Sequence, residues 1–395
     1  MTARTASPQS TSFPTTAELT ASLRRLSEVD GGELPVLSVY LDMRAHATGQ
    51  APGRRAGLVV LRDRLREIER THWPRGADYD SFKADEERIR RFLDDEFDEA
   101  AHGLAIFACS GIGLWEAIHV GVPFHDSVSA GPLPDLFQLA RLIDTHEAAV
   151  VAVVDSNTAR LFVTRTGRLE EVPGPDEDSV SFRKRSLGGW SEQRYQRHID
   201  KHIAQFAKEA AAAIEDLVAR EGARRLVLAG DEVAITPLDG EMSKALKDNL
   251  DEIVRVDMRT SRDELDDQIR HALERAEADS GRSVADRLIG AVRGGGLGVT
   301  GVEATRQALE AGAVEVLVLT ELPGAAPDET DYHDARDLGE QAEDMAEHEP
   351  GVLDLEIRNE LVRLAAATSA EVEVVADHEG LVRVGGVGAL LRYRA

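Results

Sequence analysis

A nearly continuous apolar run, AAVVAVVD at residues 148–155, constrains the fold of this chain most strongly. A strand that is apolar at every position is typical of the centre of a sheet that is covered on both faces. Two further apolar runs, RRLVLAG at 224–230 and VEVLVLT at 314–320, each follow a stretch with a helical pattern. Helices that alternate with buried strands predict an α/β fold.

The order of the predicted elements divides the 395 residues into three α/β domains, because the chain is too long for one ordinary core. We place a disordered leader at 1–16, an N-terminal domain at 17–145, a middle domain at 146–284 and a C-terminal domain at 285–395. The N-terminal domain combines three predicted helices with three predicted strands. The helices lie at 17–28, 57–71 and 80–99, and the strands at 34–43, 103–109 and 114–120, the last two forming a hairpin. Residues 131–146 connect to the middle domain.

The middle and C-terminal domains have simple element orders. The middle domain reads strand–strand–strand–helix–strand–helix–strand, with the last strand at 252–258 and an acidic helix at 261–293. The C-terminal domain repeats helix and strand, uses Gly312 as a helix C-cap, and closes with GGVGALLRYRA. Its glycine-rich start, GGGLGVTG at 294–301, lacks the lysine of a P-loop and is predicted to be a flexible entry.

The formal net charge of −26 argues against general affinity for nucleic acid or anionic membranes. A local basic patch can still dominate at contact, because charges are screened over about 8 Å at physiological salt. The single cysteine, Cys109, excludes an internal disulfide and favours a reducing compartment; we expect a buried thiol there rather than a reactive one. With no long apolar segment, the chain is expected to be cytoplasmic.

The stretch from Arg183 to Ile203, RKRSLGGWSEQRYQRHIDKHI, is cationic although the chain is acidic. A basic cluster of Arg183, Lys184 and Arg185 precedes Gly188 and Gly189, which permit backbone conformations that other residues avoid. Ser191 is a predicted N-cap of a helix that runs to about Glu221. Glu192 suits the first turn of that helix, and the spacing of Arg194, Arg197 and Lys201 places them on one face.

The segment GGWSEQRYQR resembles the loop of the class I release factors of archaea and eukaryotes, in which Gly-Gly-Gln-Ser precedes a small residue, Arg, Phe and Arg. Gly188, Gly189 and Ser191 match without a gap, as do Arg194, Tyr195 and Arg197. Trp190 stands where the family has its glutamine. A bacterial branch, similar to stalled-ribosome peptidyl-tRNA hydrolases, has glutamine after the serine, where this chain has Glu192 followed by Gln193. Another branch, with Pelota and the bacterial hibernation factor Balon, lacks the glutamine.

The resemblance covers about 148–395. It implies a ribonuclease H-like middle domain and a C-terminal α/β sandwich similar to kink-turn-binding ribosomal proteins. It also implies the ribosome as partner, through ribosomal RNA and tRNA, and a translational GTPase such as elongation factor Tu. We expect a monomer without cofactor, metal or membrane contact. The stop-codon motif of the family's first domain is not found, so decoding is not expected.

Several of these residues also have structural interpretations that involve no ligand or RNA. Trp190 either tucks back onto its domain or stacks on a base. His198 and His202 have a spacing that supports a metal, but a third ligand is not visible, so solvated or phosphate-contacting histidines are favoured. The acidic run 328–349 predicts a solvated helix or a disordered insertion.

Three functions fit the sequence. The first is a ribosome A-site-binding factor without catalysis, which acts in hibernation or rescue and holds phosphates with Arg183, Lys184, Arg185, Arg194 and Arg197. The second is a peptidyl-tRNA hydrolase that uses Glu192 or Gln193. The third is a small-molecule-binding α/β protein, for which no polar pocket is visible in the sequence.

Overall fold

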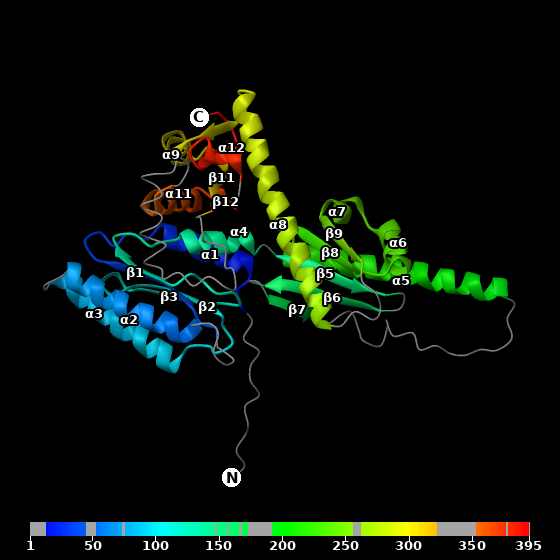
Figure 1. Cartoon of the computed structure of the whole chain (residues 1–395), viewed down its shortest axis with the longest axis horizontal. Helices are drawn as coiled ribbons and strands as arrows, with labels where there is room; N and C mark the ends of the chain where they lie inside the picture. Colours follow the sequence, from blue (N-terminus) through cyan, green and yellow to red (C-terminus); the bar gives the residue numbers. More distant parts are fainter. Residues whose placement is uncertain are drawn as a thin grey trace, which may run out of the picture. The chain divides into compact units, whose positions relative to one another are not determined.

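The computed structural model divides into two compact units, of which the first ends at Gln138 and the second begins at Leu139 (Figure 1). Both units combine helices with sheets, which confirms the predicted α/β class. The predicted domain boundaries near 145 and 285 stay predictions. The residues described are 13–44, 53–72, 76–146, 148–155, 158–165, 168–172, 192–255, 262–321, 353–376 and 378–394.

The first unit contains an antiparallel sheet with the strand order β3-β2-β1-β4. Its strands are β1 (Val36–Asp42), β2 (Gly103–Cys109), β3 (Leu114–Val120) and β4 (Ser127–Gly131). The long helices α2 (Gly53–His72) and α3 (Ala77–Asp95) pack on one face. Leu61 and Leu65 of α2 and Phe82 and Ile89 of α3 share a core with Val39 of β1.

The other face of this sheet carries Tyr40, whose ring meets that of Phe107 edge to face at 5.7 Å. Helix α1 (Thr16–Ser27) begins with a capping box, in which Thr15 and Glu18 satisfy each other's backbone N–H groups. Arg25 of α1 pairs with Glu116 of β3 at 2.8 Å. The predicted hairpin is confirmed: β2 and β3 pair along their length, and the 3-10 turn η1 (Ser110–Ile112) joins them.

Two elements around the connection predicted at 131–146 were missed, one just before it and one within it. Strand β4, which pairs with β1, ends where that connection was expected to begin, and α4 (Phe137–Thr145) lies within it. The sequence SVSAG of β4 contains small and polar residues with little strand preference, so pairing with β1 decides its conformation.

The second unit contains two sheets, of which the first has the order β7-β6-β5-β8-β9. Its strands are β5 (Ala149–Val154), β6 (Ala159–Arg165), β7 (Arg168–Val172), β8 (Arg225–Gly230) and β9 (Leu250–Arg255). The central position of β5 is confirmed, since it pairs antiparallel with β6 and parallel with β8. Strand β9 begins two residues earlier than predicted, and residues 256–258 lie outside the described part of the chain.

Helices cover both faces of this sheet. Helix α5 (Glu192–Glu221) and α6 (Glu232–Glu241), followed by the short α7 (Lys244–Asp248), share a core with Val150 and Ala152. Helix α8 (Arg262–Arg293) packs on the opposite face, where its Ile269 meets a core that includes Val151. Successive residues of β5 therefore face different helices, which explains why the run 149–154 is apolar at every position.

The second sheet has the order β10-β13-β11-β12, in which β11 is parallel to β12 and antiparallel to β13. Its strands are β10 (Gly298–Thr300), β11 (Val314–Thr320), β12 (Glu371–Val375) and β13 (Val387–Leu391), with helices α9 (Val302–Glu310), α11 (Leu355–Ala367) and α12 (Glu379–Val382). Gly312 follows α9 with a left-handed φ of 66°, as predicted. The expectation of a flexible entry at 294–301 is corrected by β10, which pairs with β13.

Among the described helices, none is both long enough and apolar enough to cross a membrane.

Candidate functional site

The candidate site is the predicted cationic loop and the start of α5, and the second unit's first sheet supports both of its ends. The chain leaves the sheet after Val172 at the end of β7 and re-enters regular structure at Glu192. Among the described strands, β7 lies at the edge of the sheet and pairs with β6. Arg160 of β6 donates two hydrogen bonds of 2.7 Å to the carboxylate of Glu171 in β7. This contact fixes β7 to β6 one residue before β7 ends.

Helix α5 is anchored by its second half. Phe206, Ala210, Ile214 and Leu217 are buried and recur at spacings of three and four residues, which places them on one face against β5 and β8. The hydroxyl of Ser243, the N-cap of α7, donates to the carboxylate of Glu215 at 2.6 Å and adds a polar contact. Gly222, with φ 63°, ends the helix where the sequence predicted.

The first turns of α5 stand clear of the sheet in Figure 1. Glu192 precedes Phe206, the first α5 side chain in the described core, by 14 residues, which is about 21 Å of helix. Such a helix end carries backbone N–H groups without helical partners and a partial positive charge, both of which favour anions.

The predicted site residues fall into two groups. Arg183, Lys184, Arg185, Gly188, Gly189, Trp190 and Ser191 lie within residues 173–191, outside the described part of the chain. Glu192, Gln193, Arg194 and Arg197 lie in the first turns of α5, where the backbone alone is described. Their helical conformation is confirmed, and the helix begins one residue after Ser191, as the predicted N-cap requires.

Metal and thiol chemistry find no support among the described side chains. No group of three or more His, Cys, Asp or Glu residues among them could hold a metal ion; the side chains of His198 and His202 are not described. Cys109 is buried, as predicted, and its Sγ lies 3.9 Å from the Ser81 hydroxyl.

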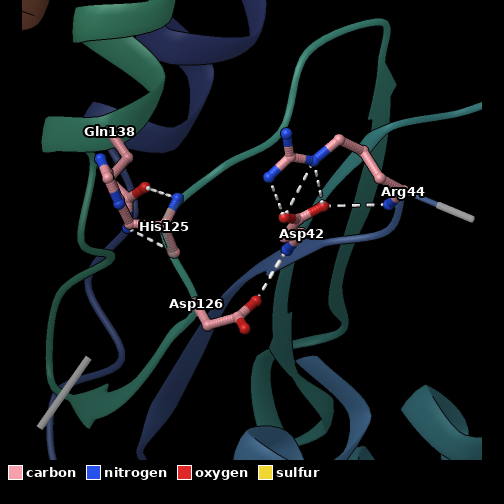
Figure 2. Close-up of polar contacts among 5 residues, drawn as sticks. All are labelled: Asp42, Arg44, His125, Asp126 and Gln138. Carbon is pink, nitrogen blue, oxygen red and sulfur yellow. Dashed lines mark hydrogen bonds and ion pairs between the residues drawn. The ribbon is translucent and has the colours of Figure 1, made fainter. Parts of the chain in front are cut away.

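A polar cluster in the first unit was not predicted from the sequence (Figure 2). The guanidinium of Arg44 contacts the Asp42 carboxylate, with the shortest hydrogen bond at 2.7 Å. The backbone N–H of Asp42 in turn donates to Asp126 at 2.7 Å, while Gln138 exchanges hydrogen bonds of 3.0 Å with the backbone of His125. Both carboxylates are engaged by donors, so the cluster holds the end of β1 and the start of β4 and offers no free acid.

Comparisons with known proteins relate two regions of the chain to release factors. Residues 134–279 match the model of bacterial archaeo-eukaryotic release factor family 10, and residues 281–395 match domain 3 of eRF1. The Bacillus subtilis uncharacterized protein YocB is 23% identical over 148 residues, which are 36% of this chain. The match spans 57% of that relative's length, little more than half.

Similar solved structures have low identity. An archaeal translation termination factor, aRF1, is 18% identical, with 96% of this chain and 99% of that chain covered and a TM-score of 0.25. Archaeal Pelota, from a ribosome-bound model with ABCE1, is 14% identical, with 97% and 95% covered and a TM-score of 0.41. Dom34 of S. cerevisiae, a termination-like factor interacting with Hbs1, is 11% identical, with 76% and 83% covered and a TM-score of 0.38.

Proposed function

Because the chain belongs to the bacterial branch of the archaeo-eukaryotic release factor superfamily, we propose that it is a ribosome-binding factor of translation. It occupies the A site of idle or stalled ribosomes, with the Gly188–Gly189 loop directed at the peptidyl-transferase centre, and acts in hibernation or rescue. The observation that carries the proposal is the match at 134–279, which contains the whole segment from β7 through the Gly-Gly loop to α5. A translational GTPase such as elongation factor Tu delivers it, as the family relation suggests.

Local charge supports contact with RNA. Residues 183–201 contain six Lys and Arg residues and two Asp and Glu residues, a net charge of +4, whereas the whole chain has −26. Because screening limits the reach of the distant acidic residues, the local excess governs contact with phosphates. Binding through this segment is therefore sensitive to salt.

The loop binds without hydrolysing peptidyl-tRNA in the leading form of this proposal. Trp190 offers a large π-face and one N–H donor, but no carbonyl that could orient a water molecule. It also fills volume in which a nucleophilic water would lie. Stacking on a base without ester cleavage follows from this chemistry.

The start of α5 at Glu192 favours a second candidate, a peptidyl-tRNA hydrolase. Glu192 and Gln193 are the first two residues of the helix, beside backbone N–H groups that lack helical acceptors. Such donors stabilise the oxyanion of an ester hydrolysis. Glu192 would act as a base and Gln193 would orient water.

Release of labelled peptide from ribosome-bound peptidyl-tRNA separates the two candidates. If the protein binds without hydrolysis, the wild type should release peptide no faster than the background rate. Trp190→Ala should then weaken ribosome binding by about 1–3 kcal/mol. The hydrolase form expects activity that survives Trp190→Ala and disappears in Glu192→Ala or Gln193→Ala. Wild-type release well above background would replace the leading form, and failure to co-sediment with 70S ribosomes at low salt would overturn both.

A further inference from the structure

We propose that the exposed side of α2, in the first unit, is a second RNA-binding surface that holds phosphates of ribosomal RNA through Arg62, Arg66 and Arg70. The inference rests on the proposed function, because ribosomal RNA is the RNA that a ribosome-binding factor meets. It assigns a role to a unit that lies almost entirely outside the two matched family regions.

The periodicity of α2 separates an apolar side from a cationic side. Leu61 and Leu65 are buried against the sheet. Arg62, Arg66 and Arg70 recur every four residues, so they form one row along the helix, which we name the arginine ridge. Its three members are exposed, and the side chains of Arg62 and Arg66 are 54% and 70% accessible. From the first to the last the ridge spans about 12 Å.

The charge of α2 contrasts with that of the chain. Residues Gly53–His72 contain six arginines and three acidic residues, a net charge of +3 against −26 for the whole chain. Two of the three acids are engaged elsewhere, since Glu69 accepts from the Tyr79 hydroxyl of α3 at 2.9 Å and Glu67 pairs with Arg64 at 2.9 Å.

The third acid, Asp63, contacts the ridge itself. It lies 2.8 Å from Arg62 and 3.9 Å from Arg66. Exposed ion pairs of this kind contribute little to stability, so phosphates can displace Asp63 at small cost. The ridge therefore presents cationic groups that are available to an anionic partner.

Arginine rows of this kind suit a phosphate backbone. The planar guanidinium donates two parallel hydrogen bonds to one phosphate and keeps its charge at any physiological pH. A row of three, one helical turn apart, makes several contacts along one strand without reading its sequence. Sequence-independent contact is sufficient for a factor that meets the same ribosomal RNA on every ribosome.

The test compares two full-length variants with equal changes in charge for binding to 70S ribosomes over a range of salt concentrations. The ridge variant is Arg62→Gln/Arg66→Gln/Arg70→Gln. The control variant is Arg90→Gln/Arg91→Gln/Arg282→Gln, which removes three exposed arginines of other helices. Melting temperatures establish that both variants fold.

We expect the ridge variant to bind more weakly than the control, and its plot of log affinity against log salt to be shallower by about 2–3. The wild-type and control proteins should have the same slope. If the wild type and the ridge variant bind with equal affinity and slope, the ridge has no role, while the proposed function stands. If the ridge variant binds ribosomes more tightly than the wild type, the inference is also wrong. Tighter binding is the result expected if an acidic protein segment, rather than RNA, contacts the arginine ridge. If the wild-type protein does not bind ribosomes, the proposed function is wrong. In that case, binding to a short labelled single-stranded RNA tests the arginine ridge by itself. Equal affinities of the ridge variant and the control variant for that RNA would contradict the inference.

Discussion

The carboxylate of Asp144 accepts a hydrogen bond from the backbone N–H of Val374, 2.7 Å away, although 230 residues separate the two. Asp144 lies in α4 and Val374 in β12, an edge strand of the second sheet. One turn earlier in α4, Arg141 forms an ion pair with Glu321, the residue that follows β11. Helix α4 is thus attached to this sheet by two polar contacts. Through one of them, Asp144 accepts a hydrogen bond from a backbone N–H that the edge strand β12 directs away from the sheet.

Asp144→Ala should lower the free energy of unfolding by about 1.5–3 kcal/mol, because it removes a hydrogen bond to a charged acceptor and leaves a strand N–H without that partner. Urea unfolding measures the change. Asp279→Ala is the matched control: its carboxylate pairs with Arg282 on the exposed surface of α8 and should matter by less than about 0.5 kcal/mol. Equal effects of the two substitutions would show that the contact with Val374 contributes nothing.

Arg358 of α11 is fully buried and joins two distant points of the backbone. Its Nε donates to the carbonyl of Leu353 at 3.2 Å and its Nη1 donates to the carbonyl of Thr320. Burial lowers the pKa of this guanidinium to about 10, and the charge of Glu321 partly opposes that shift.

Arg358→Met should destabilise the protein by about 2–5 kcal/mol, since it keeps much of the volume but leaves two buried carbonyls without these donors. Thermal and urea unfolding check this, with Arg383→Met, an exposed arginine of the same sheet region, as the control. A loss below about 1 kcal/mol would mean that burying the charge costs as much as the two hydrogen bonds contribute.

Three consecutive side chains satisfy carbonyls at the ends of three helices. Arg392 donates to Ser369 after α11 at 2.6 Å, the hydroxyl of Tyr393 to Gly312 after α9 at 3.3 Å, and Arg394 to Gly295 after α8 at 2.6 Å. Cationic groups are favourable at helix C-termini, where carbonyls lack helical partners.

We expect Arg392→Ala/Tyr393→Phe/Arg394→Ala to lose about 1.5–4 kcal/mol, the combined effect of three exposed hydrogen bonds. Each single substitution should lose about a third of that amount. Differential scanning calorimetry would reveal the loss in the transition of the second unit. An unchanged melting temperature in the triple variant contradicts the assignment.

The carboxyl of Asp85 predicts a pH dependence of stability. Burial in α3 raises its pKa, while hydrogen bonds from the hydroxyl and backbone N–H of Ser110 lower it. A raised folded-state pKa means that the charged form is penalised on folding. Asp85 therefore contributes most to stability below its ordinary pKa of about 4, where the carboxyl is protonated. That contribution is lost as pH rises through the raised pKa.

Asp85→Asn keeps an acceptor for Ser110 and removes the charge, so its stability relative to wild type should increase as pH rises from about 4 to 7. Urea unfolding at several pH values measures this trend. Asp63→Asn is the opposite control, because hydrogen bonding to Arg62 lowers the pKa of Asp63, and its relative stability should fall as pH rises to about 4 and then stay nearly constant. Parallel profiles for wild type and Asp85→Asn would count against a raised pKa.

Charge reversal of Arg183, Lys184 and Arg185 to Glu should abolish co-sedimentation with ribosomes while the melting temperature stays nearly unchanged. The reason is that these residues lie between β7 and α5 in the chain, and the buried side chains that anchor α5, such as Phe206 and Ile214, belong to its second half. Phe206→Ala is the contrasting variant and should lose about 3–5 kcal/mol of stability. A large drop in melting temperature for the charge-reversed protein would mean that the cluster has a structural role.

Elements with strong periodicity could be predicted from the sequence alone. The apolar run at 149–154 indicated the central strand, and the helical pattern from 192 to 221 indicated α5, because each pattern records local geometry and burial at every residue. The resemblance of residues 188–197 to the release-factor loop, together with the basic cluster before it, pointed to the candidate site. The structure adds the scaffold of that site, which is the end of β7 and the start of α5.

Tertiary structure alone decided the rest. The short strands β4 and β10 have only five and three residues, too few for a clear periodic pattern, and each pairs with a strand that is distant in the sequence. The burial of Arg358 and the contact of Asp144 with Val374 depend on residues that are far apart in the chain. A polar side chain carries no local signal of its distant partner, so such contacts appear only once the chain has folded.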